Sequence, residues 1–319
     1  IAFILCAFVL YRLSNEVLRN EDMAYRSAIL FCFSPANPFF FALYTESSYA
    51  LASFCGMSLA FLAIYNVSGL HRIILNFLAS LCFAYASYIR SNGALLIGFF
   101  LYGAFITVTK AVFMERRSIG SKLLKTVVEI MLALFWSLIA CAPFVYYLYS
   151  AYTSYCTEIT SRPWCSKVPP NIYSFVQAEY WNVGFLNYYR IQQLPNFFLA
   201  APVIVISVSV CANYLKSDWK RTWRLGTLQS QKNESGLFTP RTFVFVAHLV
   251  ALLVTSLPII HIQVLTRFLL SQCPVIYWFM AEVLGASSTP PLLKTTLLSY
   301  CAAFSIIGVS LFSNFLPWT

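Results

Sequence analysis

Charged side chains are scarce in this chain of 319 residues. Asp, Glu, Lys and Arg together make up 10% of it, whereas a soluble globular domain carries about 25%. The acidic residues are the scarcer sign, with 11 Asp and Glu against 21 Lys and Arg. Hydrophobic residues make up 60% of the chain and the mean hydropathy is +0.72. The composition therefore excludes an ordinary soluble domain and indicates a protein that crosses a membrane several times.

Several chemical motifs are also absent. The chain has no glycine-rich phosphate-binding loop, no CxxC pair, no Ser/His/Asp arrangement in a recognisable context and no nucleic-acid-binding motif. It has only three histidines, and the predicted topology places His71 and His261 on opposite sides of the membrane, so we expect no metal site. The formal net charge of +10 is better explained by membrane sidedness and contact with anionic membrane lipids than by nucleic-acid binding.

Long apolar runs occupy most of the chain. They are about as long as a helix that crosses the hydrocarbon layer, whereas barrel strands are about ten residues long and alternate. We therefore predict an all-α, polytopic transmembrane protein with about ten spans, in a single domain over residues 1–319. The predicted spans are Ile1–Leu10 (partial), Ser27–Leu43, Ser47–Tyr65, Ile73–Ile89, Gly93–Thr109, Val127–Tyr149, Phe197–Leu215, Phe243–Ile262, Phe268–Leu284 and Thr295–Asn314.

Basic residues are distributed unevenly between the gaps that separate these runs. Alternate gaps hold 16 of the 21 Lys and Arg residues, and an excess of basic residues marks the cytoplasmic side. The longest gap on the far side is residues 150–196, which we predict to be a large, ordered lumenal loop. The far-side gaps also hold most of the polar clusters that could carry chemistry.

Two of these far-side clusters lie close to predicted spans. Glu46 follows a span interrupted by Pro35 and Pro38, and a carboxylate at that depth is costly unless it is paired or functional. The alternative is a helix-capping glutamate. Arg90 and Asn92 lie between two spans, where several donors could bind a phosphate or another anionic group. The alternative for Arg90 is an arginine that snorkels to the interface.

Two further far-side clusters mix aromatic and amide side chains. Trp181 and Asn182, followed by Gln193 and Asn196, could stack on a sugar ring and hydrogen-bond its hydroxyls, although an aromatic belt before a span has the same composition. The fourth cluster is His261–Phe268. If this segment is helical, Gln263 and Arg267 share one face.

Cys156 and Cys165 differ from the other cysteines because they lie in the polar far-side loop, with eight residues between them. A disulfide and two unpaired thiols are both open at this stage.

Polar groups gathered on one membrane face, without a nucleotide-binding motif, suggest a lipid-linked substrate. A transporter or flippase is an alternative, because intramembrane prolines are typical of that class. A noncatalytic membrane subunit is another.

The same segments resemble the GPI mannosyltransferase 2 (PIG-V) family, in family order and across essentially the whole chain. The matching stretches are Ser34–Ser48, Arg90–Gly93, Tyr180–Phe185, Gln193–Pro202, His261–Phe268, Tyr277–Phe279 and Asn314–Thr319.

The resemblance implies a GT-C-type glycosyltransferase of the endoplasmic reticulum membrane that works on the lumenal face. It implies an inverting enzyme that transfers the second, α1,6-linked mannose from dolichol-phosphate-mannose to a mannosylated glucosaminyl-phosphatidylinositol acceptor, without a cofactor. An accessory membrane subunit is a further candidate partner. Another dolichol-phosphate-mannose-dependent mannosyltransferase of the same type is the alternative.

The resemblance also suggests roles for individual residues. The family has a Trp-Asp pair in its first lumenal loop that supplies the candidate catalytic base, and we expect this chain to be an N-terminally truncated fragment that begins after that point. Glu46 is then a positioning or substrate-binding group. Arg90 and Arg267 are candidates to stabilise the departing phosphate. The remaining predicted substrate-binding residues are Asn92, Trp181, Asn182, Gln193, Asn196, His261 and Gln263.

Overall fold

The computed structural model describes residues 1–113, 118–156, 162–227, 235–315 and 318. These residues form helices and connecting segments, with no strand among them. The α-helices are α1 (Ala2–Leu18), α2 (Glu21–Cys32), α3 (Asn37–Phe41), α4 (Glu46–Tyr65), α5 (Gly69–Ile89), α6 (Gly98–Phe113), α7 (Ile119–Tyr155), α8 (Ile172–Trp181), α9 (Leu194–Ser217), α10 (Trp219–Trp223), α11 (Phe243–Ser256), α12 (Leu265–Leu270), α13 (Pro274–Gly285) and α14 (Pro291–Ser313). Short 3₁₀ helices are η1 (Ser91–Ile97), η2 (Ile191–Gln193), η3 (Pro240–Thr242) and η4 (Ile262–Val264).

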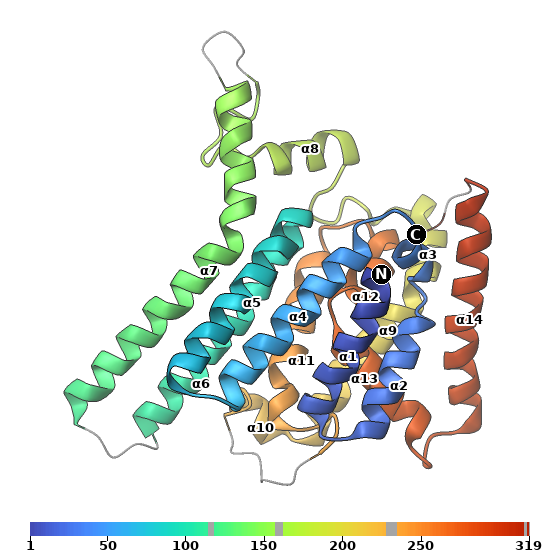
Figure 1. Ribbon diagram of the computed structural model, residues 1–319. Coiled ribbons are helices and arrows are strands. Elements are labelled where there is room, and N and C mark those ends of the chain that lie inside the picture. The colour runs from blue at the N-terminus through green and yellow to red at the C-terminus, as the bar shows by residue number, and fades with distance from the viewer. Residues whose placement is uncertain (114–117, 157–161, 228–234, 316–317, 319) are drawn as a thin grey trace.

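Most of the long helices run side by side in one bundle (Figure 1). Helix α4 packs between α1 and α5, α7 packs against α5 and α6, and α13 packs against α2 and α9. The core is rich in fully buried aromatic side chains, including Phe31, Phe54, Phe83, Phe245 and Trp278. Aromatic side chains bury a large apolar area each and fill the space between helices that already satisfy their own backbone hydrogen bonds.

The two ends of the bundle differ in the way that the basic residues predict. Helix α8 lies across one end, whereas α10 lies at the opposite end (Figure 1). We call these the α8 end and the α10 end. The first turn of α7 and the described residues between α9 and α11 are at the α10 end and hold several basic residues, including Lys122, Lys220 and Arg224. Glu46 and Arg267 lie at the α8 end.

Six helices within the described ranges are long and apolar enough to cross a membrane, or seven if one bent pair forms a single span. The polytopic, all-helical class is therefore supported, but the predicted number of about ten spans is not confirmed. Helix α1 has 17 residues and α11 has 14, and two predicted spans are broken.

Prolines explain both interruptions. The predicted span Ser27–Leu43 is divided because α2 ends at Cys32 and α3 starts at Asn37, with Pro35 between them. The predicted span Phe268–Leu284 is divided by a bend of 82° between α12 and α13. Proline opens α13, and the residue before a proline is disfavoured in the helical conformation.

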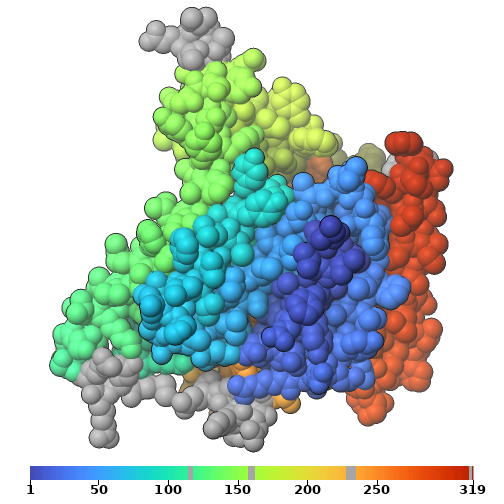
Figure 2. Space-filling model, in the orientation of Figure 1, coloured from blue at the N-terminus to red at the C-terminus, as the bar shows by residue number. Residues whose placement is uncertain are grey.

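Helix α7 has 37 residues and is therefore about 55 Å long, which exceeds the hydrocarbon thickness of about 30 Å. Its C-terminal part projects beyond the rest of the bundle at the α8 end, with α8 beside it (Figure 2). There Cys156 and Cys165 form a disulfide, with their Cα atoms 5.5 Å apart. The structure thus selects the bonded alternative for this pair, and the bond ties the end of α7 to the segment that leads into α8.

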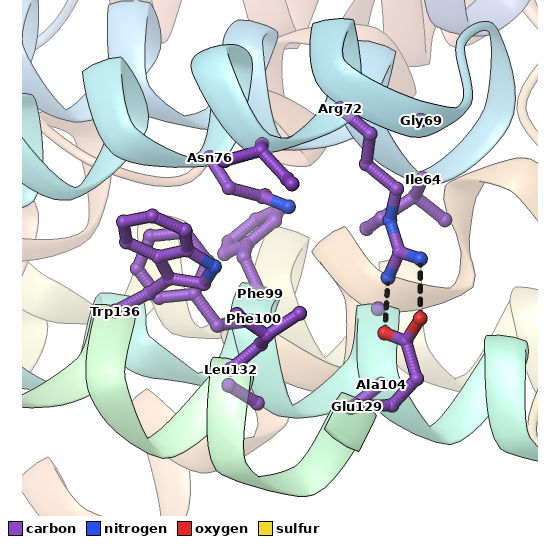
Figure 3. Close-up of a pocket in the computed structure, with 13 residues that line it drawn as sticks. Ile64, Gly69, Arg72, Asn76, Phe99, Phe100, Ala104, Glu129, Leu132 and Trp136 are labelled. Atoms are coloured by element: carbon purple, nitrogen blue, oxygen red, sulfur yellow. Dashed lines mark hydrogen bonds and ion pairs between the residues drawn. The ribbon is translucent and has the colours of Figure 1, made fainter. Parts of the chain in front are cut away.

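An ion pair fastens the other half of α7 to α5. Arg72 donates hydrogen bonds of 2.8 and 2.7 Å to the two carboxylate oxygens of Glu129 (Figure 3). The pair borders a cavity of about 190 Å³ that Asn76, Phe99 and Trp136 also line. Such a volume is smaller than the about 300–1,000 Å³ of typical ligand pockets, so we assign the pair a structural role.

Replacing Glu129 with Leu should lower the melting temperature of the purified protein in detergent. The substitution leaves a half-buried guanidinium without its partner, which costs about 1–3 kcal/mol. The double variant R72L/E129L should recover part of that loss, because neither charge is then left unpaired. A double variant less stable than E129L would contradict this assignment.

Candidate active site

A cavity of about 850 Å³ opens at the α8 end of the bundle. Its walls come from the start of α4, from η1, from α8, from the end of α11 and from α12. Ser91 Oγ donates a hydrogen bond of 2.7 Å to the hydroxyl of Tyr173, which ties η1 to α8. Helix α8 thus forms one wall of the cavity.

Glu46 is the electrostatic centre of this cavity. Its side chain is 1% exposed, and its Oε1 lies 2.5 Å from Nη1 of Arg90 and 3.4 Å from Nη1 of Arg267. Its Oε2 is buried and has no hydrogen-bond partner among the described residues. Two guanidinium groups share one carboxylate, so the cluster carries a net charge of about +1 when all three groups are ionised.

Local helix geometry brings these three side chains together. Glu46 opens α4, where the exposed backbone N–H groups favour a carboxylate. Arg90 has an extended backbone because it is the single residue between the end of α5 at Ile89 and the start of η1 at Ser91. Arg267 lies in α12, next to the break that separates α12 from α13.

Aromatic rings hold the two guanidinium groups from behind. The guanidinium carbon of Arg267 lies 4.7 Å from the ring centre of Phe39 and 5.8 Å from that of Tyr44. The corresponding distance from Arg90 to Tyr49 is 5.8 Å. The arginine side chains remain 21% and 22% exposed. N–H groups can therefore reach an anion in the cavity while the rings and Glu46 restrict the motion of both side chains.

A second polar cluster surrounds Tyr188. Its hydroxyl donates to Oε1 of Gln263 at 3.1 Å and accepts a hydrogen bond of 2.8 Å from Nδ2 of Asn196. Asn196 also donates to Oε1 of Gln193 at 2.7 Å, and the ring of His261 stacks on Tyr188 with their centres 4.6 Å apart. Burial raises the pKa of the Tyr188 phenol, which keeps it in the neutral, hydrogen-donating form.

The described residues contain no group of three or more His, Cys, Asp and Glu side chains that could hold a metal ion.

Comparison with known proteins identifies the family. A model of the family described as "Mannosyltransferase (PIG-V)" matches residues 1–319. This chain belongs to the PIG-V mannosyltransferase family. It is therefore a glycosyltransferase.

Curated relatives from distant organisms are similar over almost the whole chain. The human "GPI alpha-1,6-mannosyltransferase 2" is 31% identical, over 99% of this chain and 74% of the human protein. The "GPI mannosyltransferase 2" of Drosophila pseudoobscura pseudoobscura is 30% identical over 98% of this chain and 71% of that protein, and that of Gibberella zeae is 29% identical over 99% and 72%. No solved structure matches the chain.

The residues predicted for this mannosyltransferase fall into three groups. Glu46, Arg90, Asn92 and Arg267 line the large cavity. Four others form the cluster around Tyr188: Gln193, Asn196, His261 and Gln263. Trp181 and Asn182 are exposed at the end of α8 and lie outside the cavity lining.

The prediction that Gln263 and Arg267 share a face required one continuous helix, whereas the structure changes from η4 to α12 between them and gives them different partners. Gln263 lies in η4 and contacts Tyr188, whereas Arg267 lies in α12 and contacts Glu46. A 3₁₀ helix has 3.0 residues per turn, so the spacing rule of a continuous α-helix does not apply directly across this junction.

Sequence reasoning missed Tyr49, Tyr188 and Gln272. All three lie in or beside apolar segments, where a tyrosine or glutamine resembles any other packing residue. The short spacing from Glu46 to Tyr49, about one helical turn, is a signal that could have indicated Tyr49.

Replacing Glu46 with Gln should lower mannosyltransferase activity at least about tenfold, because two guanidinium groups then lose the charge that holds them together. If Glu46 positions the arginines, the remaining activity should keep the pH profile of the unaltered enzyme. Loss of one limb of that profile would instead identify Glu46 as an acid or base. Glu21→Gln, which alters an exposed acidic residue of α2, is the control and should retain full activity.

Proposed function

We propose that this enzyme transfers the second, α1,6-linked mannose of the GPI core from dolichol-phosphate-mannose to mannosylated glucosaminyl-phosphatidylinositol. The reaction takes place on the lumenal face of the endoplasmic reticulum membrane, within a GT-C-type architecture. The names of the relatives support the sugar and the GPI acceptor, and that of the human relative supports the α1,6 linkage. The membrane-spanning helices support substrates that are themselves lipids.

One observation carries the chemical part of the proposal. The cavity of about 850 Å³ contains a cluster with two arginines and one carboxylate. A lipid-phosphate leaving group gains negative charge as its bond to the sugar breaks. Guanidinium groups already fixed in place stabilise that charge with little reorganisation.

The proposed reaction is a single inverting displacement. The 6-hydroxyl oxygen of the acceptor mannose attacks C1 of the donor mannose, and the bond from C1 to the phosphate oxygen breaks on the opposite face. Dolichyl phosphate leaves with the electron pair, and a base takes the proton of the attacking hydroxyl. Glu46 is not that base in this proposal, because Oε1 is shared by two cations and Oε2 is enclosed.

The segment around Tyr188 also supports a wall of the cavity. The loop before α9 is bound to the end of α11, since Leu186 N donates to Pro258 O at 2.7 Å and Tyr189 donates to Leu257 O at 3.0 Å. This segment supports the cavity wall that contains Ile259 and Ile260. We place Trp181, Gln193 and Asn196 beside the path of the acceptor. An accessory membrane subunit is a further candidate partner.

Family membership favours this function over a transporter or a noncatalytic membrane subunit. A related mannosyltransferase with a different acceptor is the second candidate, because the Arg90–Glu46–Arg267 cluster would suit any polyprenyl-phosphate donor.

Replacing Arg267 with Ala should reduce mannose transfer in microsomes about 10²-fold or more, which is the usual effect of removing one charge-stabilising donor. Radiolabelled mannose incorporated into the glycolipid product is the measurement, normalised to the amount of enzyme. Arg190→Ala removes an exposed arginine from the same end of the molecule and is the matched control. Near-normal turnover by R267A would refute the proposed role of Arg267.

The complete natural protein should restore GPI-anchored proteins to the surface of cells that lack the second GPI mannosyltransferase. Flow cytometry of a GPI-anchored marker measures the result, and R267A should restore little. A protein that is well expressed and correctly located but restores nothing would favour the related transferase with another acceptor.

A further inference from the structure

A chain of hydrogen bonds runs behind the two arginines. Nδ2 of Asn92 donates to the hydroxyl of Tyr49 at 2.9 Å, and that hydroxyl donates to Oε1 of Gln272 at 2.6 Å. Nε2 of Gln272 donates in turn to the backbone carbonyl of Phe268 at 3.1 Å. The chain therefore joins η1, α4 and α12.

Each end of this chain lies close to one arginine. Asn92 follows Arg90 by two residues at the start of η1, and Phe268 is the neighbour of Arg267 in α12. In the middle, the ring of Tyr49 faces the guanidinium of Arg90. The hydrogen-bond chain thus connects the backbone that carries one arginine to the backbone that carries the other.

The interior location makes this connection stiff. Tyr49 and Gln272 are both fully buried. Buried hydrogen bonds are strong because the surroundings have a low dielectric constant, and a buried polar group that loses its partner is costly. Tyr49 cannot turn away from Gln272 without leaving a fully buried amide oxygen without its donor.

We infer that Tyr49, together with Gln272, is a positioning residue that fixes the separation of Arg90 and Arg267 for the leaving phosphate. This inference rests on the proposed function, because it assigns a purpose to the spacing of the two arginines. Tyr49 acts through the arginines and makes no contact with the reacting atoms.

Tyr49→Phe is the direct test, because it removes the hydroxyl and keeps the ring beneath Arg90. The kcat of mannose transfer in microsomes should fall about tenfold or more, since small displacements of catalytic groups cost up to about 10²-fold. KM for the donor lipid should change less than kcat, because the phosphate gains most of its charge in the transition state.

Tyr214→Phe is the matched control. Tyr214 is also buried, donates a hydrogen bond of 2.9 Å to the Thr239 carbonyl, and faces the guanidinium of Arg221 at 4.6 Å. It belongs to the α10 end of the bundle. Its variant should keep the normal kcat per folded enzyme. Equal losses of kcat in Y49F and Y214F would overturn the inference, because both would then reflect general packing.

A double variant separates positioning from packing. Arg90→Lys keeps the positive charge and loses the fork geometry. If Tyr49 acts through Arg90, Y49F should reduce kcat by less than about threefold in the R90K background, because the geometry that it maintains is already lost. If the loss of kcat in Y49F/R90K equals the product of the losses in Y49F and R90K, the inference is overturned.

The variant Y49F/Q272L gives a second measurement, independent of residual activity in R90K. This double variant should have a higher melting temperature than Y49F, because it removes the buried amide of Gln272 that Y49F leaves without its hydrogen-bond donor. A positioning role predicts that kcat stays low despite the recovered stability, whereas recovery of kcat together with stability contradicts it.

These experiments also distinguish two failures. Normal activity in R90A and R267A would remove the proposed role of the arginines and, with it, the basis of this inference. Strong loss in both arginine variants with normal kcat in Y49F would remove the positioning role of Tyr49 alone.

Discussion

A single buried carboxylate, that of Glu46, organises the cavity. An ionised carboxylate in this position is stable only because cations offset the loss of its hydration, and here two arginines share it. Its position at the first turn of α4 adds the favourable field of the helix N-terminus. The three groups come from segments that are 44 and 221 residues apart, so the cavity exists only when α4, α5 and α12 have packed.

The interruptions in the helices are the second constraint on this arrangement. Each break frees backbone carbonyls that must find donors, because there is little water inside a membrane protein. Polar side chains supply them. Ser47 donates to the Phe40 carbonyl at 2.6 Å, and Tyr277 donates to the Leu270 carbonyl at 2.9 Å. The breaks are therefore stable parts of the fold, and they place polar backbone next to the cavity.

Local features of the sequence predicted part of this structure. Apolar runs indicated the helical class, and the positions of the basic residues separated the two ends. Glu46, Arg90 and Arg267 could be selected because a charge in an apolar chain is costly without a purpose.

Contacts between distant segments could not be predicted in the same way. The pairing of both arginines with Glu46 depends on the bend between α12 and α13. A hydropathy pattern predicts one continuous span over these two helices and does not indicate the bend. Tyr49 and Gln272 carried no signal of charge. Trp181 stays a prediction from composition, because it is exposed at the end of α8 and no contact with the cavity supports or contradicts a role in sugar binding.

The unequal distances within the cluster indicate how it could favour the transition state over the bound substrate. Arg90 lies 2.5 Å from Glu46 Oε1 and Arg267 lies 3.4 Å from it, so Glu46 neutralises Arg90 more fully. Arg267 therefore retains more of its charge for an incoming anion. A phosphodiester brings one negative charge, which balances the net charge of the cluster, and the second charge develops only as the sugar leaves. Interactions that strengthen during the reaction are the ones that raise kcat, so a cluster held rigidly by Glu46 from one side and by Tyr49 from the other is suited to the departure of a phosphate.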